Sequence, residues 1–134
     1  MKTTTLFAVS VALMFAGCAP VAITALGVGM ATGVSHQLGG IVYKTFTTPQ
    51  AEVRRATMSA LNRMQVKVTQ SKRSGTTETI LGRAGDRDIE VELEALTPAT
   101  TRMTVTARKD AGLLRDSATA TEIILQTEKV LGPT

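Results

Sequence analysis

The segment DIEVELEALTPATTRMTVTAR, residues 88–108, alternates apolar and polar side chains on both sides of a turn at Pro98. Alternation with a period of two is typical of a strand that buries only one face. The two halves therefore predict two neighbouring strands of an antiparallel sheet. Their apolar face consists of Ile89, Val91, Leu93, Ala95, Met103, Val105 and Ala107.

Three shorter segments before this pair extend the predicted sheet. Residues 41–47, IVYKTFT, are rich in β-branched and aromatic side chains, which favours a strand. Residues 64–69 alternate in the same way as the central pair, and a weaker strand is expected around residues 79–81. We therefore expect a sheet of four to five strands.

Two further segments have the spacing of amphipathic helices. The first is expected to begin with Thr48 as its cap and Pro49 at its first position, where the missing N–H costs nothing. Its apolar side chains recur at helical spacing, whereas Arg54 lies off this stripe and is expected in solvent. The second helix is expected to begin near Asp116 and to stop at Gly132.

The predicted order of elements is β-α-β-β-β-β-α. Each helix has one apolar stripe and each strand one apolar face, so both helices are expected on one face of an antiparallel sheet. The sequence thus predicts an α+β fold, a two-layer sandwich, over residues 41–134. The chain of 134 residues has room for one such domain behind an export signal.

The N-terminus has the three parts of an export signal. Lys2 precedes an apolar run over residues 6–16, and small residues precede Cys18, the only cysteine. The run is shorter than the about 20 apolar residues that span a bilayer. Ordinary cleavage after Ala19 would leave Pro20 first in the product, which signal peptidases generally reject. A free, buried cysteine is the remaining alternative.

The segment that ends at Cys18 resembles the lipobox of bacterial lipoproteins. This resemblance implies a signal peptide over residues 1–17, cut before a cysteine whose thiol carries diacylglycerol. The residue after the cysteine is not Asp, which in enteric-type bacteria resembles an inner-membrane retention signal, so the periplasmic side of the outer membrane is expected. Residues 18–40 then contain the lipidated cysteine and a Gly/Ala-rich apolar linker. The G-x-x-x-G spacing at residues 29–33 leaves open a segment that packs on a membrane partner.

Composition argues against nucleic acid as a partner, although the formal net charge is +4 and the pI is near 9.6. Basic and acidic residues are interspersed, the chain has no Trp, and Tyr43 is its only tyrosine. A protein that binds single strands needs both a basic groove and aromatic stacking residues. The predicted export of the protein also argues against a nucleic-acid partner. The single cysteine also excludes an internal disulfide.

One set of charged side chains forms a candidate interaction face. Four acids occupy alternate positions along residues 88–94. Arginines of the neighbouring strand fall on the same outward face of the predicted sheet, so cross-strand ion pairs are available. Acids at this spacing could bind Ca²⁺, but calcium sites usually wrap a loop around the ion, and we expect no metal site. The candidate face consists of Asp88, Glu90, Glu92, Glu94 and Arg102.

No catalytic constellation can be assembled from the sequence. His36 is the only histidine, and no nucleophile or orienting group can be assigned to it. The sequence contains no P-loop, no H-E-x-x-H motif and no paired C-x-x-C. We therefore expect neither an enzyme nor a cofactor.

Taken together, these features resemble a family of small bacterial lipoproteins known only as a domain of unknown function. The resemblance rests on Cys18, the small-residue tract over 19–33, the strand and helix over 43–64, and the strands closed by a C-terminal helix. The layout of residues 49–131 is also similar to the repeated domains of the lipoprotein subunit of the outer-membrane β-barrel assembly machine. A fold does not determine a function.

Two functions are expected from these observations. The first is a non-enzymatic, lipid-anchored envelope protein whose periplasmic module docks on another envelope protein, either through the sheet face with the acids or through a free sheet edge. The alternative is a periplasmic module that binds a small ligand or a metal between the sheet and the helices.

Overall fold

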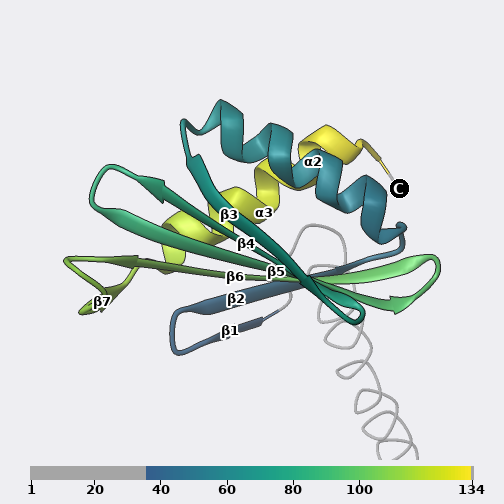
Figure 1. The fold of residues 1–134 in the computed structure, drawn as a ribbon, viewed down its shortest axis with the longest axis horizontal. Helices are drawn as coiled ribbons and strands as arrows, with labels where there is room; N and C mark the ends of the chain where they lie inside the picture. The colour runs from purple at the N-terminus through teal and green to yellow at the C-terminus, as the bar shows by residue number, and fades with distance from the viewer. Residues whose placement is uncertain (1–35, 134) are drawn as a thin grey trace, which may run out of the picture. The chain divides into compact units, whose positions relative to one another are not determined.

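The computed structural model describes residues 36–133. The predicted signal peptide, Cys18 and the linker up to residue 35 lie outside the described residues. The folded unit contains a sheet with two helices packed on it (Figure 1). Its elements are β1 (His36–Leu38), β2 (Ile41–Phe46), α2 (Gln50–Arg63), β3 (Lys67–Ser74), β4 (Thr77–Ala84), β5 (Arg87–Thr97), β6 (Thr100–Lys109), β7 (Leu114–Arg115) and α3 (Ser117–Leu131).

The sheet is antiparallel, with the spatial order β1-β2-β6-β5-β4-β3, and β7 pairs with the end of β6. The central pair, β5 and β6, is the hairpin that the sequence predicts, with Val91 opposite Val105 and Leu93 opposite Met103. The α+β class and the order β-α-β-β-β-β-α of the main elements are confirmed. The structure adds the two short strands β1 and β7.

Strand β1 lies within residues 18–40, where the sequence predicted a linker. It pairs with β2 through a two-residue turn at Gly39 and Gly40, whose φ angles are 55° and 83°. Two consecutive left-handed residues match the right-handed twist of a hairpin, and glycine adopts this conformation without a steric penalty. The Gly-Gly pair in front of the β-rich run is therefore the sequence signal for this additional strand.

The start of α2 differs from the prediction by one residue. Pro49 occupies the N-cap position rather than the first helical position, and Thr48 does not cap the helix. The carbonyl oxygen of Thr48 instead accepts a hydrogen bond from the Thr101 hydroxyl at 2.8 Å, which joins the helix entry to β6. The start of α3 agrees with the prediction, because the Asp116 side chain accepts a hydrogen bond from the Thr119 N–H at 3.1 Å.

Both helices pack on the same face of the sheet, as Figure 1 shows, and they also pack on each other. The core between the two layers is apolar, and no buried side-chain nitrogen or oxygen of residues 36–133 lacks a hydrogen-bond partner. Its largest fully buried apolar side chains are Leu61, Ile80, Leu93, Met103, Ile123 and Ile124. Among residues 36–133, no helix packs on the opposite face of the sheet.

Candidate functional site: the outer face of the sheet

The face of the sheet that the helices leave uncovered carries the acids predicted from the sequence. Along β5, Ile89, Val91 and Leu93 are buried beneath the helices. The intervening acids point to the other side because successive side chains of a strand alternate between faces. They are half-buried or exposed, and they are Asp88, Glu90, Glu92 and Glu94.

Arginines of both neighbouring strands pair with three of these acids. The Arg102 guanidinium of β6 lies 3.4 Å from Glu94, and that of Arg108 lies 3.7 Å from Glu90. On the β4 side, Arg83 Nε donates to Asp88 at 2.9 Å, which raises the pKa of Arg83 above its usual value. These pairs are exposed to solvent, so each contributes little to stability.

Glu92 differs from the other three acids. Its neighbours across the two strands are Thr79 and Thr104, and within the described part of the chain it forms no ion pair. The centre of the face therefore contains an exposed carboxylate between two threonines. Such a group keeps its acceptor capacity for a donor on another molecule.

The outer face is hollowed at the end where β5 begins. A concavity of about 430 Å³ lies there, half open to solvent. Its rim contains the Arg83–Asp88 and Glu90–Arg108 pairs, and Leu81 provides an apolar patch. The remaining lining residues are Thr69, Gly82 and Ile89. The alternative function predicted a ligand between sheet and helices, whereas this concavity lies on the opposite side of the sheet.

The arrangement of the acids does not form a metal site. Among residues 36–133, no three His, Cys, Asp or Glu side chains are grouped closely enough to hold an ion. A flat strand presents its carboxylates in a row, and three of the four already face a guanidinium. The chemistry available on this face is that of hydrogen-bond donors, acceptors and paired charges.

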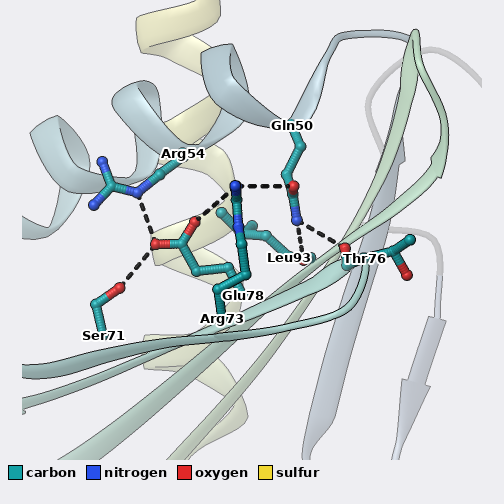
Figure 2. Close-up of polar contacts among 7 residues, drawn as sticks. All are labelled: Gln50, Arg54, Ser71, Arg73, Thr76, Glu78 and Leu93. Atoms are coloured by element: carbon teal, nitrogen blue, oxygen red, sulfur yellow. Dashed lines mark hydrogen bonds and ion pairs between the residues drawn. The ribbon is translucent and has the colours of Figure 1, made fainter.

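A second polar cluster, which the sequence did not predict, lies on the helix side of the sheet (Figure 2). Its centre is Glu78 of β4, which is 4% exposed and lies on the same, helix-covered face of the sheet as Ile80. The carboxylate accepts hydrogen bonds from Arg54 Nε at 2.7 Å and from the Ser71 hydroxyl at 2.8 Å, and it lies 3.6 Å from the Arg73 guanidinium. Arg54 was expected in solvent, and its side chain is 43% exposed, but its guanidinium is bound to Glu78.

The surroundings of Glu78 keep it ionised. Burial by itself raises the pKa of a carboxyl group, but the hydrogen bonds from Arg54 and Ser71 and the positive charges of Arg54 and Arg73 outweigh burial. The net effect lowers the pKa of Glu78 below its ordinary value of 4.5. The site is a satisfied carboxylate and not a proton donor at neutral pH.

Gln50 extends this cluster to the next strand. Its side-chain amide donates to the carbonyl oxygens of Thr76 at 2.9 Å and Leu93 at 2.6 Å, and its carbonyl oxygen accepts from Arg73 at 3.2 Å. Figure 2 shows how these contacts join the first turns of α2 to the β3–β4 hairpin. The cluster therefore positions the helix on the sheet, and we assign it a structural role.

The other conspicuous charged group also has a structural role. Asp116, the N-cap of α3, accepts a hydrogen bond from Arg87 Nε at 2.6 Å. This bond, together with the bonds from the backbone and the hydroxyl of Thr119, lowers the pKa of Asp116 from 3.8 to about 2.

His36 lies in β1 and is part of the folded unit. No helix of the described residues is both long and apolar enough to cross a bilayer.

Comparison with known proteins identifies a family but no activity. No curated protein matches the chain. A family model described as "Protein of unknown function (DUF3568)" matches residues 1–124, which include the Cys18 segment and most of the folded unit. The chain therefore belongs to this family of proteins of unknown function.

Proposed function

We propose that this protein is a non-enzymatic, lipid-anchored protein of the bacterial cell envelope, and that it binds another envelope protein through the outer face of its sheet. The observation that carries this proposal is the one-sided architecture. Helices α2 and α3 cover one face of the sheet, while the opposite face carries ordered charges and a concavity. A sheet face that the helices of residues 36–133 leave uncovered offers a surface for a partner.

The pattern of charges on this face supports a protein partner. Glu90, Glu94 and Asp88 are each held by an arginine, so their positions are defined before binding. Glu92 lies among them without an ion pair in the described residues. An arrangement of defined charges with one open acceptor favours specificity by electrostatic complementarity. A basic or amide-rich surface fits it.

The longer of the two sheet edges is a less favourable site for the partner. Strand β3 forms this edge, and its register shifts between Val68 and Gln70. A bulge of this kind, with the basic residues Lys67, Lys72 and Arg73 along the strand, is a common means of preventing edge-to-edge pairing. We therefore place the partner on the face and not on the edge.

The anchor in this proposal is Cys18 with its lipid, and the expected location is the periplasmic side of the outer membrane. The test compares intact mass and membrane fractionation of the native protein with those of a Cys18→Ala variant. We expect a mature N-terminal cysteine that carries acyl-chain mass, recovered in outer-membrane fractions. An unmodified protein free in the periplasm would refute the anchor.

The docking face is tested by site-specific photocrosslinking in intact cells. A photoreactive residue replaces Glu92 on the outer face or, as a matched control, Arg55, which is exposed on α2. We expect a discrete crosslinked partner from position 92 and not from position 55. Equal crosslinking from both positions, or none from position 92, would contradict the proposal.

A second candidate function is supported by the concavity of about 430 Å³, which is large enough for a small ligand. A ligand or Ca²⁺ that binds the folded state raises the melting temperature. The alternative predicts such a rise, abolished by Glu90→Gln combined with Glu92→Gln. If the face binds only a macromolecule, the ligand or ion should leave the melting temperature unchanged in both the wild type and the double variant.

A further inference from the structure

The only exposed large apolar side chains in residues 39–133 are three leucines, and two of them are neighbours. Leu113 is 84% exposed and Leu114 is 51% exposed, both at the β6–β7 hairpin. Leu96, which is 39% exposed, lies near the end of β5, close to the opposite end of β6. An adjacent pair of exposed leucines on a domain that covers most of its large apolar side chains indicates a contact surface.

The backbone of the hairpin tip holds these leucines outward. Asp110, Ala111 and Gly112 all have positive φ angles, of 54°, 55° and 90°. The N–H of Gly112 donates to the Lys109 carbonyl and that of Leu113 to the Asp110 carbonyl, both at 3.2 Å. Left-handed backbone is costly for residues other than glycine and persists where surrounding contacts impose it. The tip is therefore a defined turn.

The base of the hairpin is fixed to the rest of the domain. Lys109 pairs with Leu114 across the two strands. The Arg115 guanidinium donates to the Gly39 carbonyl oxygen at 2.6 Å, and its side chain packs so closely on Gly40 that a Cβ there would lie 2.6 Å from Arg115 Cβ. The hairpin thus projects from the end of the sheet in a set direction (Figure 1).

The charges around the leucines are mainly positive. The segment from Arg108 to Arg115 contains three basic residues and one acid, a formal charge of +2. Within residues 36–133, Arg108 is paired with Glu90, whereas Lys109 and Arg115 take part in no ion pair. Exposed leucines flanked by uncompensated cations match the surface of an anionic bilayer, where apolar side chains enter the acyl boundary and cations bind headgroup phosphates.

We propose that the tip of the β6–β7 hairpin is a membrane contact, in which Leu113 and Leu114 enter an anionic lipid surface and Lys109 and Arg115 bind its phosphates. This contact is additional to the lipid on Cys18 and does not depend on it. It would hold the folded domain in one orientation on the membrane.

The sequence makes a sharp test available, because the chain has no Trp and one Tyr. A Leu113→Trp variant places a single tryptophan at the tip, and Leu96→Trp places one at the other end of β6 as the matched control. Both positions are exposed, so the core is left intact; Leu114→Trp serves as a second reporter at the tip. Each mature, full-length variant is added to vesicles of equimolar phosphatidylcholine and phosphatidylglycerol, with or without bromine on the acyl chains.

We expect the emission of the tryptophan at position 113 to move to shorter wavelength and to be lost in brominated vesicles, while emission from position 96 is unchanged. The quenching at position 113 should weaken in pure phosphatidylcholine and at high salt. Protein that sediments with vesicles but is quenched equally little at both positions would overturn the hairpin contact and leave the Cys18 anchor standing. Quenching at position 113 without Cys18 lipidation would support the hairpin alone.

Discussion

Replacing Glu78 by glutamine tests the polar cluster beneath α2. The substitution keeps the size of the side chain and one carbonyl oxygen, but it removes a negative charge from a site that is 4% exposed. The carboxylate accepts hydrogen bonds from Arg54 at 2.7 Å and from Ser71 at 2.8 Å, and Arg73 lies 3.6 Å away. The variant therefore loses the charge-assisted part of all three contacts.

The expected loss follows from these contacts. A hydrogen bond to a charged group contributes about 1.5–3 kcal/mol. Removing one partner of a fully buried ion pair costs about 3–5 kcal/mol, because the other charge stays buried. Here the side chains of Arg54 and Arg73 are 43% and 60% exposed and recover water when the carboxylate is neutralised. We therefore expect Glu78→Gln to lower the free energy of unfolding by about 1.5–3 kcal/mol at pH 7.

The effect should also depend on pH. The pKa of Glu78 is lowered below 4.5 in the folded state, so the folded state favours the ionised form. The stability that this ionisation contributes is complete above pH 4.5, and it is lost as the pH falls through the lower, folded-state pKa. The difference between the wild type and Glu78→Gln should accordingly be constant near neutrality and shrink in acid.

The assay is urea unfolding followed by far-ultraviolet circular dichroism at several pH values. The slope of the free energy against urea concentration should not change, because the fold is retained. The matched control is Glu92→Gln on the outer face, which we expect to stay within about 0.5 kcal/mol of the wild type. A Glu78→Gln variant as stable as this control at pH 7 would refute the role assigned to the cluster.

Substitutions at three further positions test other features by thermal or urea unfolding. Asp116→Ala removes the cap of α3 and should cost about 0.5–2 kcal/mol at neutral pH, whereas Asp116→Asn should retain most of the cap. Because the pKa of Asp116 is about 2, the contribution of its charge should be lost only as the pH falls from about 3.8 to about 2, and a loss at higher pH would contradict this assignment. Gly82→Ala would bring a Cβ within 2.8 Å of Val66 Cγ1 and should cost about 1–3 kcal/mol; an unchanged melting temperature would show that the contact relaxes freely. Ala111→Gly should stabilise the protein by up to about 1 kcal/mol, because Ala111 has a φ of 55°, and an unchanged urea midpoint would argue against strain in this turn.

The outer face illustrates what can be predicted from local periodicity. The alternation over residues 88–108 places Glu90 and Glu94 on the face opposite to Val91, and it gives Arg102 and Arg108 the same outward parity. The observed pairs Glu94–Arg102 and Glu90–Arg108 follow from this parity and from the register of one hairpin. Both are consequences of sequence-adjacent strands joined by a short turn.

The limits of the prediction lie where distant segments meet. Arg54 lies off the apolar stripe of α2 and was expected in solvent, yet it reaches a carboxylate 24 residues away in the sequence. Ser71 and Arg73 face the same carboxylate only because the register of β3 shifts between Val68 and Gln70. The shift reverses which side chains of β3 point towards the helices, and the period of the sequence alone does not contain this information.

The sequence by itself determined the order of the main elements, the buried faces of the central β5–β6 pair and the α+β class, because amphipathic periodicity is a local property of the chain. Only the tertiary structure decided that Glu78 is a buried, ionised centre between α2 and the β3–β4 hairpin. It also decided that Leu113 and Leu114 remain uncovered at the end of the sheet. Burial, pKa and exposure depend on which distant segments pack together, and that pairing is a property of the whole fold.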